Sequence, residues 1–346
     1  MIAIIDPFFL LKKVVLLGLS ISMQKLTAIP TLEDLKMAHQ AIQKYVHNTP
    51  ILHSDSINAL LGVDIHFKCE NFQKIGAFKM RGASCAIAGL SEAERAAGVA
   101  THSSGNHAQA VALAARLNQI EAHIVMPRDA PQIKRKAVAG YGALIYDSEP
   151  DIKSRHTRTQ EVLAKTGATF VHPYDNYNII AGQGTAALEM LAAEPDLEMI
   201  LAPVGGGGLM SGTALACHYH HRDTIAVGCE PKMVDDAYRS YQSGEIETNE
   251  NIDTIADGLR TNLGHKTLEI IRKHVAKIIL VEEQTIVDAM RLIWERMKIV
   301  IEPSGAVPLA AVMTEPDFFR DKKIGIIISG GNVDLEKLPF SPPSFE

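Results

Sequence analysis

From Thr31 onward the chain alternates short apolar segments with longer helix-like segments, and this alternation limits the fold more than any other feature. Consecutive parallel strands need a crossover, which is usually a helix, so the pattern predicts an α/β protein with parallel sheets. The segments that we predict as strands are Asp64–Cys69, Val99–Thr101, Ala122–Pro127, Gly142–Tyr146, Ala168–Pro173, Met199–Ala202, Ala226–Glu230, Lys277–Val281 and Lys323–Ser329. Ligands of such sheets bind at the carboxyl ends of the strands.

Helix signals fit the same pattern. Thr31 and Asp34 form a capping pattern, and we expect the helix that it starts to run through Tyr45, before Pro50 ends it. A second helix is predicted over Arg81–Leu90, between two of the strand segments.

Length and composition restrict the class of protein. A chain of 346 residues is too long for one small core and suggests two domains. The formal net charge of −6, from 34 Lys and Arg against 40 Asp and Glu, gives no basis for nucleic-acid binding and favours small-molecule partners. Cys69, Cys85, Cys217 and Cys229 lack metal-binding spacing, so we expect reduced thiols in the cytoplasm.

The first 22 residues differ from the rest of the chain. Their apolar run is far shorter than a bilayer span, and Lys12 and Lys13 interrupt it. No Ala-x-Ala cleavage signal follows. We therefore interpret residues 1–22 as an extension from a mis-assigned start before Met23, and predict no membrane association. A membrane anchor, which would make the chain a membrane-tethered interaction protein, is the alternative interpretation of these residues.

One lysine stands between an aromatic residue and a helix-forming run in the segment Asn71–Ala83. Lys79 follows Phe78 and comes three residues after the turn glycine Gly76. Burial of a lysine lowers its pKa, and the neutral amine is a nucleophile toward aldehydes. Lys79 is therefore our candidate Schiff-base lysine, although a solvated surface lysine is the more common case.

A small polar loop within Thr101–Ala110 joins a strand-like segment to an apolar helix-like run. Its free backbone N–H groups and the positive end of the helix dipole can hold a carboxylate. The residues that we assign to substrate binding are Ser103, Ser104, Gly105, Asn106 and His107.

A run of four glycines lies between another strand-like segment and a helix-like one. Glycines let a backbone approach a phosphate with its N–H groups, whereas a flexible loop is the alternative interpretation. The run is neither a P-loop nor the spaced-glycine dinucleotide motif. The residues that we assign to phosphate binding are Gly205, Gly206, Gly207, Gly208 and Leu209.

A lysine nucleophile, a carboxylate loop and a phosphate loop together call for a cofactor with an aldehyde and a phosphate, which is pyridoxal 5'-phosphate. With Ser329-Gly330-Gly331-Asn332, these motifs resemble, in order and spacing over Thr31–Leu335, the fold-type II pyridoxal-phosphate enzymes, in particular serine racemases and serine/threonine dehydratases. The resemblance implies two open, twisted, mostly parallel sheets with flanking helices. It also implies a large cofactor-binding domain (23–89 plus 175–340), a small domain (90–174) and a cofactor between them.

The resemblance assigns further contacts to the cofactor. Phe78 would pack against its ring, and Asn106 would bond its phenolic oxygen. Ser329 would bond the pyridine nitrogen, although Ser-Gly-Gly is also common turn chemistry. A hydroxyl at that nitrogen suits elimination and proton exchange more than transamination.

Two carboxylates follow another predicted strand. Glu230 and Asp236 suit Mg²⁺, Mn²⁺ or Ca²⁺ better than zinc, but a solvated acidic turn is the plainer interpretation of such residues. The resemblance to serine racemases implies a divalent-cation site formed by Glu230, the Val234 carbonyl and Asp236. The histidines that we interpret as a solvated helix end rather than a zinc site are His218, His220 and His221.

The implied activity is that of a serine racemase with L-serine and L-threonine dehydratase (ammonia-lyase) activity, which releases pyruvate or 2-oxobutanoate and ammonia. Racemisation needs one proton carrier on each face of a planar carbanion. Lys79 serves one face, and the resemblance gives the other to Ser104, where many threonine dehydratases carry alanine.

Other features keep alternatives open. Tyr174 stands where the mammalian racemase has asparagine and is closer to the dehydratases, and hydroxyaspartate dehydratases share the two-serine loop. A threo-3-hydroxyaspartate dehydratase is therefore the alternative, with Arg155 as a contributor or else a surface arginine. A pyridoxal-phosphate-binding regulatory protein without turnover is the alternative from another class. The resemblance also suggests a homodimer and a nucleotide effector.

Overall fold

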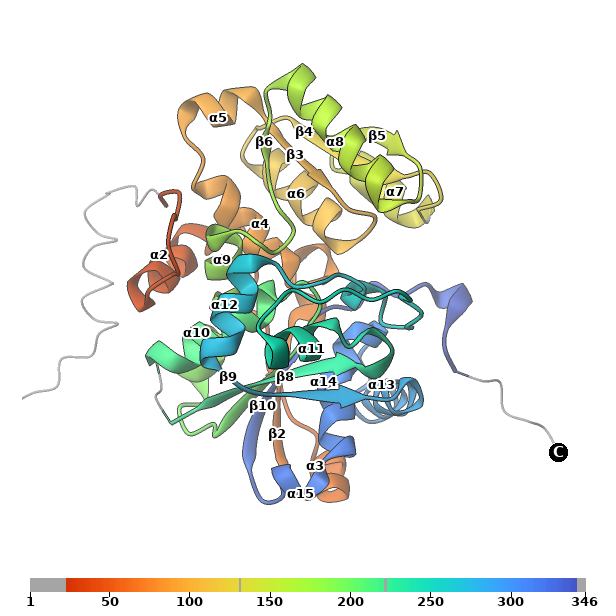
Figure 1. Cartoon of the computed structure of the whole chain (residues 1–346). Helices are drawn as coiled ribbons and strands as arrows, with labels where there is room; N and C mark the ends of the chain where they lie inside the picture. Colours follow the sequence, from red (N-terminus) through yellow and green to blue (C-terminus); the bar gives the residue numbers. More distant parts are fainter. Residues whose placement is uncertain (1–22, 131, 221–222, 341–346) are drawn as a thin grey trace, which may run out of the picture.

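The computed structural model describes residues 23–130, 132–220 and 223–340, which form two β-sheets (Figure 1). A six-stranded sheet has the order β1-β2-β10-β7-β8-β9, and a four-stranded sheet has the order β5-β4-β3-β6. Neighbouring strands are parallel except for β1 and β2. The strands are β1 (Ile51–Leu52), β2 (Asp64–Cys69), β3 (Val99–His102), β4 (Ala122–Pro127), β5 (Leu144–Ser148), β6 (Thr169–Phe170), β7 (Met199–Pro203), β8 (Ile225–Pro231), β9 (Val275–Val281) and β10 (Lys323–Ile328).

Helices precede or follow most of these strands, so the predicted α/β fold with two open, mostly parallel sheets is confirmed. The helices are α2 (Leu32–Ile42), α3 (Asp55–Leu61), α4 (Lys79–Ala88), α5 (Glu92–Ala97), α6 (Asn106–Leu117), α7 (Gln132–Gly140), α8 (Ile152–Thr166), α9 (Tyr177–Ala193), α10 (Gly208–His220), α11 (Asp236–Ser243), α12 (His265–His274), α13 (Glu283–Met297), α14 (Pro303–Thr314) and α15 (Pro316–Phe319). None of those described combines the length and hydropathy that a bilayer crossing requires. The predicted extension 1–22 and the side chains of His220 and His221 lie outside the described residues.

The six-stranded sheet is buried on both faces because its strands carry apolar residues at successive positions. In β7, Met199 and Leu201 face a core with α13 and α14, whereas Ile200 and Ala202 face a core with α9 and α10. Successive side chains of a strand point to opposite faces, so one apolar strand serves both cores. Because β7, β8 and β10 are parallel, their carboxyl ends lie together at one edge of the sheet.

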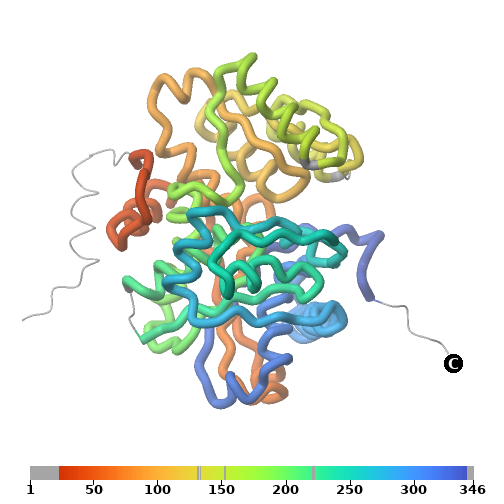
Figure 2. The backbone as a smooth tube through the Cα atoms, in the orientation of Figure 1, coloured from red at the N-terminus to blue at the C-terminus, as the bar shows by residue number. Residues whose placement is uncertain are grey.

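The four-stranded sheet uses residues between Val99 and Phe170, which fall inside the predicted small segment 90–174. We call this sheet with its helices the small unit, and the six-stranded sheet with its helices the large unit. Helix α4 lies between them in Figure 1 and contacts both α6 and α9. Its Met80 and Ile87 belong to the core of the small unit. The tube in Figure 2 shows the chain passing between the units through this middle layer.

Several predicted boundaries differ from the structure, and three of the differences matter for the site or the core. The predicted capping box at Thr31 and Asp34 forms, but the helix ends at Ile42 instead of Tyr45. Tyr45 lies in the turn that follows, and its hydroxyl donates to the Asn118 Oδ1 over 3.0 Å. The predicted strand 168–173 is paired over only two residues, Thr169 and Phe170, at the edge of the four-stranded sheet. Helix α10 begins inside the glycine run, so the phosphate-binding prediction falls on a helix N-terminus.

Candidate active site

Lys79 is the first residue of α4, and its backbone is fixed against the end of β10. The Phe78 N–H donates to the Ser329 carbonyl over 3.0 Å, which holds the lysine beside the predicted pyridine-binding serine. The Lys79 Nζ donates to the Pro173 carbonyl over 2.9 Å and lies 5.1 Å from the centre of the Phe78 ring. Burial lowers the pKa of Lys79 to about 8, although Glu302 opposes this shift. The amine therefore holds its proton weakly near neutral pH.

The glycine run lies directly after β7 and is buried throughout. Gly207 has φ +84°, in the left-handed region that favours glycine. A Cβ on Gly206 would overlap the Tyr174 ring, and a Cβ on Gly207 would lie 2.7 Å from Leu263. Side chains larger than hydrogen are therefore excluded from this loop by its neighbours.

A row of aromatic side chains leads from the small unit to the glycine run. His102 stacks on Phe170, and the rings of Phe170, His172 and Tyr174 follow at centroid distances of 5.8 and 4.7 Å. Burial lowers the pKa of His172 to about 4 and raises the pKa of Tyr174 to about 12. Both rings therefore stay neutral near pH 7. Tyr174, which the sequence marked only as a departure, covers Gly206.

The Ser103–His107 loop follows β3 and opens α6. The Ser103 hydroxyl accepts from the Gly105 N–H over 3.2 Å, and Ser104 is half-buried beside it. The buried His107 places Nε2 3.2 Å from the Val171 carbonyl, while its Nδ1 has no hydrogen-bond partner among the described residues. Burial and the nearby Lys79 hold the pKa of His107 well below its usual range. The loop therefore offers a neutral acceptor at Nδ1.

Asn106 belongs to a network that the sequence did not reveal in full. Its Nδ2 donates to the two Glu302 carboxylate oxygens over 3.0 and 3.2 Å. Asn332 donates to the Asn106 Oδ1 over 2.9 Å and to the Ile75 carbonyl over 2.6 Å. These bonds fix the rotamer of the residue predicted to meet the phenolic oxygen. A glutamate directly before Pro303, at the start of a helix-like run, was the signal for Glu302.

A buried ionic cluster surrounds Arg81, two residues after Lys79 in α4. The guanidinium of Arg81 is fully buried and pairs with Glu70 and Glu189, each at 2.8 Å. Lys68 completes the cluster by pairing with Glu189 at 2.7 Å, so two positive and two negative charges balance. Because buried charges need such partners, the cluster fixes the position of α4 and therefore of Lys79. No charge partner of Arg81 was predicted from the sequence, because Glu70 and Glu189 stand 11 and 108 positions away, beyond the reach of local patterns.

The predicted metal ligands lie together at the end of β8, and the solvated acidic turn is a wrong interpretation of them. Glu230 and Asp236 are each only 1% exposed, and Val234 is buried. Glu230 accepts from the N–H groups of Ala237 and Tyr238, each over 2.8 Å, at the start of α11. Burial raises the pKa of Glu230 well above its usual range and that of Asp236 to about 7.

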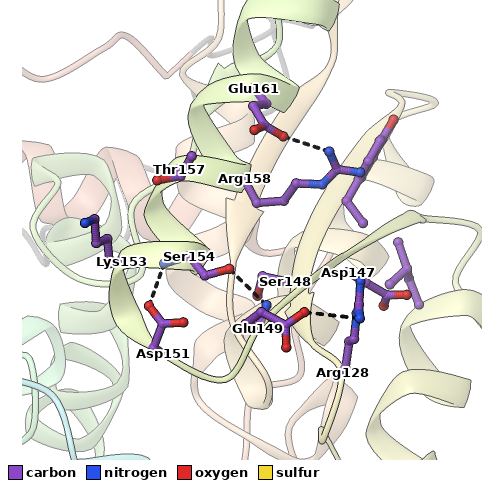
Figure 3. Close-up of a pocket in the computed structure, with 12 residues that line it drawn as sticks. Arg128, Asp147, Ser148, Glu149, Asp151, Lys153, Ser154, Thr157, Arg158 and Glu161 are labelled. Atoms are coloured by element: carbon purple, nitrogen blue, oxygen red, sulfur yellow. Dashed lines mark hydrogen bonds and ion pairs between the residues drawn. The ribbon is translucent and has the colours of Figure 1, made fainter.

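A groove of about 820 Å³ lies elsewhere. It opens on the small unit between β5 and α8 (Figure 3). Its charges pair with one another, Arg128 with Glu149 at 3.1 Å and Arg158 with Glu161 at 2.8 Å. None of the predicted site residues lines it. The candidate site is therefore the region between the units, where other residues link the predicted ones. Phe78 joins Lys79 to Ser329, Pro173 and Tyr174 join Lys79 to the glycine run, and Glu302 holds Asn106 and acts on the charge of Lys79.

Comparison with known proteins identifies the family of the chain. The model of the family described as "Pyridoxal-phosphate dependent enzyme" matches residues 42–330. The chain belongs to this family. It is 47% identical to a beta-hydroxyaspartate dehydratase of Paracoccus denitrificans, over 90% of this chain and 99% of that protein. It is 46% identical to a serine racemase of Dictyostelium discoideum, over 90% of this chain and 97% of that protein. A crystal structure of the Dictyostelium racemase matches with a TM-score of 0.85, covering 89% of this chain and 100% of that one.

The residues of this pyridoxal-phosphate enzyme fit the cofactor in two places. The buried N-terminus of α10 carries N–H groups without intrahelical partners and a positive dipole, which a phosphate satisfies. The Lys79 amine, whose pKa is lowered to about 8, loses its proton more readily than an ordinary lysine, which suits a bond to an aldehyde.

Proposed function

We propose that this pyridoxal-phosphate enzyme is a serine racemase that also eliminates water from L-serine and L-threonine, giving a 2-oxo acid and ammonia. The observation that carries the proposal is the partly buried Lys79 amine with its lowered pKa, held beside Ser329 by the backbone of Phe78. The similarity to the serine racemase of Dictyostelium and to the dehydratase of Paracoccus supports the same reaction class.

We assign the cofactor contacts as follows. The N-terminus of α10 would bind the phosphate through the backbone of the glycine run. Lys79 would hold the aldehyde carbon, Asn106 the phenolic oxygen and Ser329 the pyridine nitrogen, with Phe78 against the ring. Bound pyridoxal phosphate supplies an electron sink that stabilises negative charge on the substrate Cα.

The chain supplies the proton carriers. With its pKa near 8, the Lys79 amine can take the Cα proton on one face and return it. The Ser104 hydroxyl, half-buried on the loop from the small unit, would carry the proton on the opposite face. The N–H groups of that loop would hold the substrate carboxylate at the start of α6. The same Lys79 could protonate a departing β-hydroxyl, which leads to elimination instead of racemisation.

The proposal is tested with L-serine, L-threonine and threo-3-hydroxyaspartate, by chiral chromatography of serine and by release of 2-oxo acid. Ser104→Ala should slow serine racemisation by ~10²–10⁴-fold, because one face loses its proton carrier, while proton removal by Lys79 continues. Lys79→Ala should abolish both reactions, and borohydride reduction of wild type should label the peptide that carries Lys79.

Clear outcomes would contradict parts of this scheme. Unchanged conversion of L- to D-serine by Ser104→Ala would remove the two-face mechanism. Full turnover by Lys79→Ala would remove the lysine assignment. Cofactor binding without turnover of any of the three amino acids would favour a regulatory protein.

A specific observation favours threo-3-hydroxyaspartate as a second candidate substrate. Arg155 is half-buried rather than a free surface arginine, its Nε has no partner among the described residues, and its charge reaches His102 beside the two-serine loop. Such a guanidinium can bind the second carboxylate of hydroxyaspartate, which serine lacks. Arg155→Ala should then reduce hydroxyaspartate turnover about tenfold to a hundredfold and spare serine. Arg116→Ala, an exposed arginine of α6, is the control, and equal losses on both substrates would reject this role.

We further propose that Glu230, the Val234 carbonyl and Asp236 bind Mg²⁺, Mn²⁺ or Ca²⁺. The buried Asp236 Oδ2 has no hydrogen-bond partner among the described residues, and two carboxylates in one buried site call for a cation. Both Glu230 oxygens already accept one N–H each, which leaves a further lone pair on each for a metal.

Magnesium should therefore stabilise the folded enzyme, by about 2.7 kcal/mol at a hundred times its Kd. Thermal unfolding with Mg²⁺ and with chelator measures this, and Asp236→Asn should lose the difference while the exposed Asp253→Asn keeps it. If neither Mg²⁺ nor chelator changed the unfolding temperature of the wild-type protein, the proposed site would be excluded.

We further propose a homodimer and a nucleotide effector, which rest on the resemblance alone. We also propose a cytoplasmic location, which rests on the four buried free cysteines. Light scattering, nucleotide titration of serine turnover and cell fractionation test them separately.

A further inference from the structure

A second group of metal-ligand side chains lies at the outer edge of the six-stranded sheet, away from the residues assigned above. His53, His66 and Glu194 each offer one ligand atom, and these atoms lie within 4.8 Å of one another. The rings of His53 and His66 are nearly perpendicular, at 85°, with their centres 4.5 Å apart. Neither the proposed reaction nor the proposed magnesium site uses any of the three.

The fold explains why these residues meet. In the antiparallel pair of β1 and β2, Ile51 lies opposite Lys68 and Leu52 opposite Phe67. Continuing this register by one residue places His53 opposite His66, and directly opposed residues project on the same face of a sheet. Glu194, the C-cap of α9, approaches the same face.

The surroundings of His66 independently indicate a ligand. It is 5% exposed, and neither ring nitrogen makes a hydrogen bond to any described residue. Its Nδ1 lies 3.3 Å from the Glu194 Oε1, and its Nε2 lies 3.4 Å from the Asp64 Oδ1. Metal-binding histidines characteristically present one nitrogen to the metal and the other N–H to a carboxylate. Asp64 is placed to orient His66 in that way.

We infer that His53, His66 and Glu194 form a binding site for zinc or a similar transition metal. Two imidazoles with one carboxylate favour zinc, copper, nickel or cobalt over Mg²⁺, which prefers oxygen ligands alone. Ligands about 2.0–2.1 Å from a tetrahedral zinc stand roughly 3.3 Å apart. The observed limit of 4.8 Å requires a small movement, which the exposed His53 can make.

The local charges favour a cation. Glu194, Asp64 and Asp196 provide three negative charges, whereas Lys323 provides one positive charge by pairing with Glu194 Oε2 at 3.0 Å and with Asp196 at 2.6 Å. Lys323 therefore holds one oxygen of Glu194 and leaves the other facing His66. A bound ion would connect β1, β2 and the end of α9, with water as its fourth ligand.

The test uses the untagged, cofactor-loaded enzyme, because a histidine tag would itself bind zinc. Zinc chloride is titrated against a chromogenic chelator, and thermal unfolding is measured with and without one equivalent of zinc. We expect one tightly bound equivalent and a higher unfolding temperature. His53→Ala and Glu194→Gln should each weaken binding at least tenfold, and Asp64→Asn should weaken it about tenfold to a hundredfold through His66.

Controls separate this site from others. His265→Ala, which removes an exposed histidine of α12, and Asp236→Asn, at the proposed magnesium site, should leave zinc binding unchanged. His53 is exposed and Glu194→Gln keeps the side-chain shape, so circular dichroism of both variants should match wild type. Absence of zinc binding in wild type, or equal affinity in wild type, His53→Ala and Glu194→Gln, would overturn the inference. Neither the zinc titration nor the thermal unfolding depends on which amino acid the enzyme converts.

Discussion

Glu302 shows how a single buried carboxyl can order the site. It is 4% exposed, holds the Asn106 amide and faces the Lys79 amine, whose pKa it raises against the effect of burial. Burial, with a smaller contribution from Asp257, raises the pKa of Glu302 to about 7. Near neutral pH the carboxyl is therefore partly protonated, and its charge affects the proton affinity of the lysine.

The raised pKa predicts how stability depends on pH. In the unfolded chain a glutamate titrates near 4.3, so from about pH 4 to 7 the folded state binds a proton that the unfolded state does not. The stabilisation that the folded state gains from this protonated Glu302 is on the order of 3 kcal/mol. It is fully present below about pH 4 and is lost as the pH rises through 7. Cofactor-free Glu302→Gln should lack this component when its free energy of unfolding is compared with wild type across that range. As a control, exposed Glu295→Gln should keep the wild-type dependence of the unfolding free energy on pH. The same dependence in Glu302→Gln and wild type would contradict the raised pKa of Glu302.

At the scale of an element, the N-terminus of α10 combines a helix dipole, a glycine run and an aromatic lid. Tyr174 covers Gly206, and Asp175 next to it accepts from the N–H groups of Lys266 and Thr267 at the start of α12 over 2.9 and 3.3 Å. Thr267 in turn donates to the Gly206 carbonyl over 2.9 Å. The segment after β6 therefore fixes the glycine run from outside.

Gly206→Ala should weaken cofactor binding without unfolding the protein. The new Cβ would displace the Tyr174 ring and shift the N–H groups that we assign to the phosphate. We expect at least a tenfold rise in the Kd for pyridoxal phosphate, about 1.4 kcal/mol. Fluorescence titration of the cofactor-free protein measures it. Gly140→Ala, where a Cβ would meet open space, is the matched control, and an unchanged Kd in Gly206→Ala would place the phosphate elsewhere.

The elements themselves were predictable where local chemistry decides them. The capping box at Thr31 and the strand Ala122–Pro127 formed as expected because neighbouring residues specify them. Contacts between distant segments were not predictable in this way. Glu302 reaches Asn106 across 196 positions, and Arg81 reaches Glu189 across 108, with no trace in local periodicity. Only the resemblance brought the predicted cofactor contacts together before the structure was known.

At the scale of the whole molecule, the proposed cofactor contacts come from both units. Asn106 belongs to the small unit, whereas the glycine run and Ser329 belong to the large unit, and each unit has its own apolar core. Direct links between the units near the site include Asn106 with Glu302 and Lys134 with Asp257 at 2.9 Å. The second pair is partly solvated and contributes little, about 0–1 kcal/mol. A ligand held by both units therefore adds substantially to their coupling.

Removal of the cofactor should loosen both units at the site together. Hydrogen exchange followed by mass spectrometry, with and without pyridoxal phosphate, reports the backbone N–H groups of the Ser103–His107 loop and of the glycine run in separate peptides. Because bound cofactor would contact both, we expect both peptides to gain protection, while α13 on the far side of the large unit stays unchanged. In Lys79→Ala the phosphate contact persists without the covalent bond, so protection of the glycine run should exceed that of the loop. Protection confined to the glycine run in the wild-type enzyme would mean that the small unit does not hold the cofactor, and the assignment of Asn106 would fail with it.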